Sequence, residues 1–151
     1  MTGLDAFEAA LATLGRKERT VRELSEWLRR RGFGDADVEA AIARLIEAGE
    51  LDDERFALRF AEDKRELAGW GGERIRDALI ARGVATTTVD AVLAADSYAD
   101  QLERARRLLI ERGRPLEADA DRRRALEYLA RRGYDYEVAS EAVRSPSGRA
   151  A

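Results

Sequence analysis

The chain has 151 residues, enough for one domain or a small array of repeats with a buried core. It has no cysteine and no histidine, which excludes disulfides and serine–histidine or cysteine–histidine nucleophiles and argues against zinc. No apolar run approaches the length of a membrane span, and the acidic N-terminal segment does not resemble a signal peptide, so we expect a cytoplasmic protein.

Charge is spread unevenly along the chain, although the net charge is only −3 from 27 basic and 30 acidic side chains. Residues 51–100 are the most acidic part, and residues 101–151 carry a net positive charge. Sequence-independent DNA binders usually have a basic excess, because neutralisation of phosphates supplies their affinity. The acidic middle part therefore suits a basic protein surface better than it suits DNA.

Apolar residues at helical spacing, with acidic or hydroxyl residues at helix starts and glycines at helix ends, predict nine helices and no strand. The first and seventh predicted helices run near 4–14 and 98–112. The second opens at Thr20 and ends at Gly32, the third opens at Asp35 or Asp37 and stops at Gly49, and the fourth begins at Asp52–Asp53 and reaches Leu67. The fifth holds Ile75, Ala78 and Leu79 and ends at Gly83, the sixth starts within 86–88 and carries Leu93, the eighth follows an acidic turn at Asp119 and Asp121 and ends at Gly133, and the ninth begins at Asp135 and reaches Val143. The second has the clearest start, since Thr20 and Glu23 have the spacing of a capping box. The apolar face predicted for the first helix consists of Leu4, Phe7, Leu11 and Leu14.

An internal repeat is the strongest sign of how the chain is organised. Three stretches read LRRRGF, LIARGV and LARRGY, and their glycines, Gly32, Gly83 and Gly133, are 51 and 50 residues apart. Each glycine is interpreted as the residue after a helix end, where a positive φ is easily adopted and the next side chain packs back on the helix. The predicted fold class is therefore all-α, with three tandem three-helix (helix-turn-helix-like) repeats in an elongated, curved array. The predicted boundaries are 1–50, 51–96 and 97–144, followed by a disordered tail at 145–151.

Three adjacent carboxylates, Asp52, Asp53 and Glu54, form the most obvious acidic cluster. They could bind a divalent cation or act as acid and base. Adjacent residues project from different faces of a helix, so an acidic helix start is the better interpretation. We expect no catalytic residue, no metal site and no cofactor.

The segment Gly69–Arg74, which reads GWGGER, has the glycine content of a phosphate-binding loop. It lacks the preceding strand and the Gly-Lys-Ser/Thr ending that such loops need. A flexible joint before a helix start is the simpler interpretation. Trp70 could fill a core or anchor an interface, and the sequence favours neither.

Clusters of arginine recur along the chain. They could contact phosphates or pair with carboxylates of a partner protein. For any single cluster, a solvated helix face balanced by nearby acidic residues is the favoured interpretation. The clusters consist of Arg29, Arg30 and Arg31; Arg104, Arg106 and Arg107; Arg122, Arg123 and Arg124; and Arg131 and Arg132.

Several stretches resemble the RecX family of small regulators of the RecA recombinase. The stretch RKERTVRELSEWLRRRGF at 16–33 is similar to the family's first-repeat pattern. The stretch LDDERFALRF at 51–60 resembles its most recognisable block. In GWGGERIRDALIARGV at 69–84, Gly72 stands where the family usually has proline and Arg82 where it usually has lysine. The resemblance spans nearly the whole chain and is weaker in the third repeat.

The resemblance implies three tandem three-helix repeats and a non-enzymatic protein. It also implies binding to the RecA–single-stranded DNA filament, with modulation, mainly inhibition, of RecA ATP hydrolysis, strand exchange and coprotease activity. An independent helical DNA-binding protein is the alternative, which the net negative charge disfavours. A carboxylate enzyme has the least support. No coiled-coil seam demands a dimer, so we expect a monomer.

The candidate site residues divide into two groups. The partner-binding candidates are Asp52, Asp53, Arg55, Trp70, Arg74 and Arg76. The candidates for contact with the filament, or for weak contact with single-stranded DNA, are Arg29, Arg30, Arg31, Arg106, Arg107, Arg122, Arg123, Arg124, Arg131 and Arg132.

Overall fold

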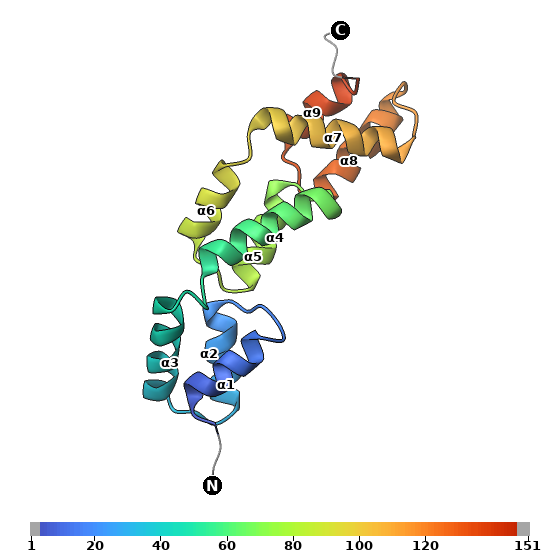
Figure 1. The fold of residues 1–151 in the computed structure, drawn as a ribbon. Helices are drawn as coiled ribbons and strands as arrows, with labels where there is room; N and C mark the ends of the chain where they lie inside the picture. The colour runs from blue at the N-terminus through green and yellow to red at the C-terminus, as the bar shows by residue number, and fades with distance from the viewer. Residues whose placement is uncertain (1–3, 148–151) are drawn as a thin grey trace. The chain divides into compact units, whose positions relative to one another are not determined.

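The computed structural model describes residues 4–147, in which short turns and loops connect helices and no strand is present (Figure 1). Its nine helices lie close to the predicted ranges, which confirms the all-α fold class. They are α1 (Ala6–Leu14), α2 (Val21–Arg30), α3 (Asp35–Glu47), α4 (Asp53–Leu67), α5 (Gly72–Ala81), α6 (Thr86–Ala94), α7 (Tyr98–Arg112), α8 (Asp119–Arg131) and α9 (Tyr136–Arg144). No helix among the described residues is both long enough and apolar enough to cross a membrane.

Local side-chain chemistry sets where several helices begin. The predicted capping box of α2 is present: Glu23 N donates to Thr20 Oγ1 at 3.2 Å, and Thr20 N donates to Glu23 Oε1 at 3.0 Å. Asp5, Ser97 and Asp135 accept equivalent bonds at the starts of α1, α7 and α9. Such caps satisfy backbone donors that the first helical turn leaves without partners.

The three repeated turns have the predicted helix-ending geometry. Gly32, Gly83 and Gly133 adopt φ of +95°, +91° and +99°, which only glycine takes easily. In each turn the residue after the glycine donates its backbone N–H to the carbonyl five residues earlier, at 3.1–3.2 Å. This is the bond that closes a Schellman motif. We call residues 31–33, 82–84 and 132–134 the first, second and third turn.

Tertiary contacts divide the chain into two compact units. One consists of the residues up to Arg59 together with Leu79–Val89, and the other of Phe60–Ala78 together with the residues from Asp90 onward. The first unit has a core that includes Leu24, Leu28 and Leu45. The second has a core built mainly from α7, α8 and α9. The predicted repeat boundaries stay a prediction, because this division follows contacts rather than sequence repeats.

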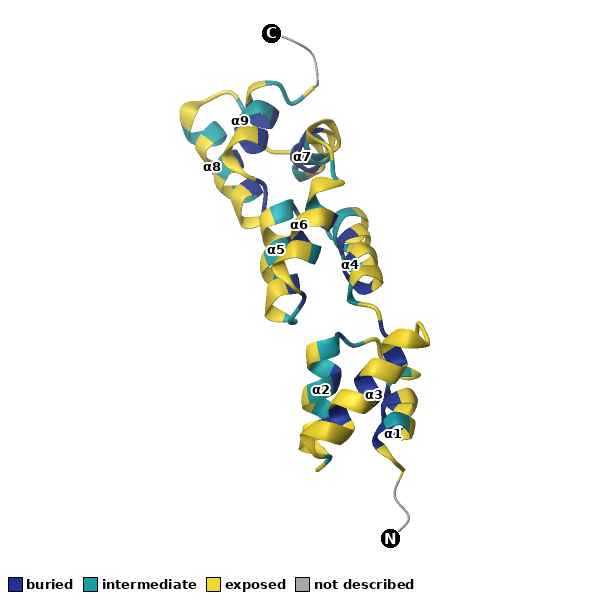
Figure 2. Ribbon diagram, turned by 90° about the vertical axis from the view of Figure 1, so that its left-hand side faces the viewer, coloured by how far each residue is buried: buried dark blue, intermediate teal, exposed yellow. Residues whose placement is uncertain are grey.

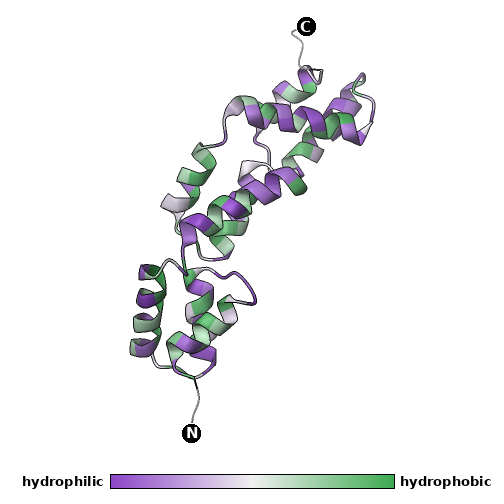
Figure 3. Cartoon of the chain, viewed as in Figure 1, coloured by the Kyte–Doolittle hydropathy of each residue, from purple (hydrophilic) through white to green (hydrophobic). Residues whose placement is uncertain are grey.

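Most helices bury one side and expose the other (Figure 2), and apolar and polar residues share the same helices (Figure 3). The face predicted for α1 is confirmed only in part: Phe7 and Leu14 pack on the core of the first unit, whereas Leu4 is 56% exposed and Leu11 is 36% exposed. The helix instead buries Ala6, Ala9, Ala10 and Thr13. Small side chains let α1 approach its neighbours closely, and this leaves its larger residues at the edge of the contact.

In the first unit, the second turn packs on the start of α2. Thr20 is fully buried, and its hydroxyl donates to the Arg82 carbonyl at 2.7 Å. The Arg82 guanidinium donates twice to the Glu23 carboxylate, each at 2.8 Å, and Arg22 donates to the Ala81 carbonyl. Side chains therefore make this junction between the end of α5 and the start of α2.

In the second unit, the third turn packs on the start of α5 through backbone bonds. Gly71 N donates to Arg132 O at 2.7 Å, and Glu73 N donates to Gly133 O at 3.0 Å. A Cβ added to Gly71 would lie 2.5 Å from the carbonyl carbon of Gly133. The segment expected to be a flexible joint is thus a packed junction, whose glycines allow two backbones to meet.

The predicted tail at 145–151 lies partly outside the described residues, which end at 147. Within the described part, the Ser145 carbonyl accepts a bond from Arg106 Nε at 2.7 Å.

Candidate functional site

The two predicted carboxylates, Asp52 and Asp53, cap two different helices. Asp52 Oδ1 accepts from Arg55 N at 3.1 Å, at the start of α4. Asp53 Oδ1 accepts from Val21 N at 2.9 Å, at the start of α2. Burial raises the pKa of Asp53 above its ordinary value, against the lowering effect of the Val21 bond. These roles agree with the acidic helix start inferred from the sequence.

No group of three or more carboxylates within residues 4–147 could hold a metal ion. Asp52 and Asp53 thus act as helix caps in the described part of the chain.

Trp70 is half-buried just before α5, and two cations lie against its ring. Its ring lies 4.7 Å from Lys64 Nζ and 4.2 Å from the guanidinium carbon of Arg74, distances typical of cation–π contacts. Phe60 meets it edge to face, with the ring centroids 6.2 Å apart. Trp70 thus combines packing on the protein with partial exposure to solvent.

The cluster at the end of α2 contains one free cation and two engaged ones. Arg29 pairs with Asp35 at 3.1 Å, and Arg31 lies over Trp27 with 4.4 Å between its guanidinium carbon and the ring. Arg30 is exposed and has no partner among the described residues.

The arginines of α7, α8 and α5 are mostly engaged in local contacts. Arg106 bonds Ser145 O and lies 3.7 Å from Glu141, and Arg132 donates to Ala68 O at 2.6 Å. The remaining engaged candidates pair with carboxylates on their own or a neighbouring helix: Arg76 with Asp90, Arg122 with Asp119, Arg123 with Glu127 and Arg124 with Asp121.

The side chains of four of the candidates, all exposed, make no ion pair, hydrogen bond or ring contact within residues 4–147: Arg30, Arg55, Arg107 and Arg131. Arg55 also lines a cavity of about 260 Å³ in the first unit, together with Arg19 and Arg59. These four cations can contact a partner without losing an internal interaction.

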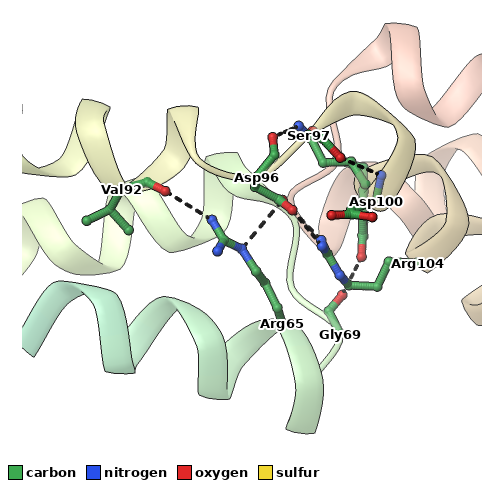
Figure 4. A network of polar contacts seen from close by, with 9 residues as sticks. Arg65, Gly69, Val92, Asp96, Ser97, Asp100 and Arg104 are labelled. Carbon is green, nitrogen blue, oxygen red and sulfur yellow. Dashed lines mark hydrogen bonds and ion pairs between the residues drawn. The ribbon is translucent and has the colours of Figure 1, made fainter.

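A buried charge network in the second unit was missed by sequence reasoning (Figure 4). The Asp96 side chain is only 7% exposed and accepts from Arg104 at 2.7 and 3.2 Å. Arg65 Nε lies 3.4 Å from the same carboxylate and is itself mostly buried. Burial opposes the charge on Arg104, but its bonds to Asp96 outweigh this and raise the pKa of Arg104 above its usual range.

The network links several segments of the second unit. Arg65 belongs to α4, Asp96 follows α6, and Arg104 belongs to α7. Tyr134, in the third turn, is buried and donates its hydroxyl to Gly69 O at 3.1 Å. No sequence motif marks these residues, because their pairing depends on tertiary packing.

The described residues, 4–147, thus form an all-α protein of nine helices. Two family models match the chain: the first three-helix domain of RecX at residues 6–45, and the second at residues 52–93.

Relatives agree with this match. The regulatory protein RecX of Halorhodospira halophila is 42% identical over 130 residues, covering 84% of this chain and 79% of that protein. The regulatory protein RecX of Thermus thermophilus is 36% identical, covering 94% and 92%. The crystal structure of RecX from Lactobacillus salivarius shares the fold, with a TM-score of 0.86 at 17% identity over 93% of this chain and 94% of that one.

The chain therefore belongs to the RecX family of regulatory proteins. Members of this family are regulators and not enzymes, in agreement with the expectation from the sequence.

Proposed function

We propose that this protein binds the RecA–single-stranded DNA filament in the cytoplasm and lowers RecA ATP hydrolysis, strand exchange and coprotease activity. Membership of the RecX family over most of the chain is the observation that carries the proposal. Its role would lie in DNA repair and recombination.

The distribution of free cations supports contact with a filament. Arg30, Arg55, Arg107 and Arg131 are exposed and unengaged within the described residues, whereas most other candidate arginines already have internal partners. An exposed arginine without an internal partner can bind phosphate or a carboxylate without breaking anything in its own fold. We therefore assign partner contact to these four, together with the exposed part of Trp70.

The filament is the favoured partner over DNA alone. The net charge of −3 gives little sequence-independent attraction to phosphate. A repeat protein can reach several subunits of a polymer, so modest contacts gain strength through avidity. A few phosphate contacts would then assist binding that depends mainly on protein surfaces.

The direct test is RecA's single-stranded-DNA-dependent ATP hydrolysis, measured with this protein well below one molecule per RecA. Inhibition of most of the activity at that ratio is expected for a regulator that acts on a polymer. Undiminished hydrolysis, together with tight, steeply salt-dependent binding to DNA alone, would overturn the proposal in favour of an independent DNA-binding protein.

The residue assignment is tested by Arg107→Ala, which we expect to weaken inhibition severalfold while leaving helicity unchanged. Arg16→Ala is the matched control, because Arg16 is also exposed and unengaged within the described residues but is not among the candidates. Equal inhibition by both variants and the wild type would remove Arg107 from the contact surface.

A further inference from the structure

The repeated turn serves as a docking element twice within this chain. The second turn packs on the start of α2, and the third turn packs on the start of α5. In both junctions the carbonyls at a helix end accept bonds from donors at a helix start. The negative end of one helix dipole thereby meets the positive end of another.

The first turn has the same backbone but no docking partner in the described part of the chain. No atom lies within 4 Å of a Cβ added to Gly32, whereas Gly83 and Gly133 meet atoms at 2.6 and 2.5 Å. The residue after the glycine is buried in the docked turns, at 4% for Val84 and 2% for Tyr134, but only half-buried for Phe33. The carbonyls of Arg31 and Gly32 accept no hydrogen bond from residues 4–147.

The start of α8 is the matching open element. Among the described residues of the second unit, no repeated turn covers it, and Ala118 offers no side-chain cap to the N–H groups of α8. It resembles the start of α2 in one respect. Asp121 Oδ2 accepts from Ala118 N at 3.1 Å, just as Glu23 reaches back to Thr20 N.

We propose that the first turn of one molecule docks on the start of α8 of a second copy. Charge supports this occupant, since Arg29–Arg31 lie at the turn while Asp119 and Asp121 occupy the first turn of α8. In the second turn, Arg82 binds Glu23 at the third position of α2. Arg31 is its counterpart and binds Asp121, the third residue of α8.

The contact uses two different patches, so it joins copies head to tail and can continue into a chain of molecules. It is weak in dilute solution because its charges have competing partners. Arg31 stacks on Trp27, Asp121 lies 3.5 Å from Arg124, and Asp119 pairs with Arg122. Exposed ion pairs also gain little in water.

Sedimentation at low salt, from micromolar to near-millimolar concentration, measures the association. The average mass of the wild type is expected to rise with concentration, and Arg31→Glu and Asp121→Arg are each expected to weaken self-association at least tenfold. Arg16→Glu is the charge-matched control and should behave as the wild type does. A wild type that stays monomeric throughout would overturn the proposal.

Mixing the two variants gives the decisive result. Arg31→Glu keeps an intact α8 start, and Asp121→Arg keeps an intact first turn, so an equimolar mixture should regain an association that neither variant shows alone. A mixture as monomeric as each variant alone overturns the head-to-tail contact. This inference does not depend on RecA, so its failure leaves the proposed function standing, and the ATP hydrolysis assay judges that function separately.

A folding defect is excluded by a second measurement on the same samples. Helicity and the urea midpoint of each variant should lie close to those of the wild type. The chain has no cysteine, so Arg30→Cys and Asp119→Cys proteins can also be mixed under mild oxidation. The mixed disulfide should form several times faster than either homodimer, and equal rates would contradict the contact.

Discussion

The two docked turns perform the same task with different chemistry. At the start of α2 the contact is made by side chains, namely the hydroxyl of Thr20 and the ion pair between Glu23 and Arg82. At the start of α5 it is made by backbone groups, since Gly71 and Glu73 donate directly to the third turn. The junction at α2 depends on particular side chains, whereas the junction at α5 depends on glycine, which has no side chain to keep the two backbones apart.

The difference extends to the charges around each junction. Glu23 and Arg82 keep 27% and 29% of their side-chain surface exposed, so water still solvates part of the pair. In the second unit, Asp96 with Arg65 and Arg104 is nearly buried beside the third turn. A buried network has more to lose when one member is removed, because the remaining charges cannot recover their solvation.

Among the variants that test this difference, Asp96→Asn should lose the most stability. It leaves Arg65 and Arg104 without their shared carboxylate, and loss of one partner of a buried ion pair costs about 3–5 kcal/mol. The measurement is the free energy of unfolding from urea titration. Asp90→Asn is the control, because the Asp90–Arg76 pair is largely exposed and should cost below about 1 kcal/mol. Similar losses in both variants would contradict the importance of burial.

Gly71→Ala should have the next largest effect, because its Cβ would meet the backbone of Gly133 and Tyr134 at 2.5 and 2.6 Å. Backbone cannot move aside as a flexible side chain can, so we expect a loss of about 3 kcal/mol, typical of severe overpacking. Gly72→Ala is the matched control, since its nearest atom is Leu93 Cδ2 at 3.8 Å. That variant should stay within about 1 kcal/mol of the wild type. Equal urea midpoints for the Gly71→Ala and Gly72→Ala variants would mean that the backbone at this junction can shift at little cost in stability.

Thr20→Val tests the side-chain junction. The substitution keeps the shape but removes the cap on Glu23 N and the donor to Arg82 O, so we expect a loss of about 2 kcal/mol. Thr20→Ser keeps the hydroxyl and should lose about 1 kcal/mol or less, through the missing methyl group. If the serine variant is the less stable of the two in urea titration, packing and not hydrogen bonding holds this junction.

Sequence reasoning succeeded where a feature depends on neighbours in the chain. The capping box of Thr20 and Glu23 and the positive φ of the repeated glycines follow from local rules and are present. The nine helices follow from periodicity in the same way.

Prediction from the sequence failed where a feature depends on segments that are far apart in the chain. The packing of Gly71 on Gly133 and the meeting of Arg65 with Asp96 join residues far apart in the sequence, and no spacing rule reveals them. The exposure of Leu4 and Leu11 was missed for a related reason, since alanine can lie on either side of a helix until its neighbours are known.

The smallest expected effect is a pH dependence confined to the side-chain junction. Burial opposes the charge on Glu23, but bonds from Arg82 and from Thr20 N outweigh it and hold the pKa of Glu23 below its ordinary value of 4.5. A lowered carboxyl pKa gives stability that is present above the ordinary value and is lost as the pH falls through the folded-state value.

Glu23→Gln should therefore lower the free energy of unfolding by about 1 kcal/mol at pH 7, and the difference from the wild type should shrink as the pH falls below 4.5.

Asp53 should change stability with pH in the opposite direction. Burial raises its pKa above 3.8, so its contribution to stability is present in acid and is lost as the pH rises. Asp53→Asn keeps an acceptor for Val21 N and should be no less stable than the wild type at pH 7. Urea titrations at pH 3, 5 and 7 compare the three proteins. A Glu23→Gln deficit that stays constant across this range would show that the Arg82 contact acts through shape rather than through charge.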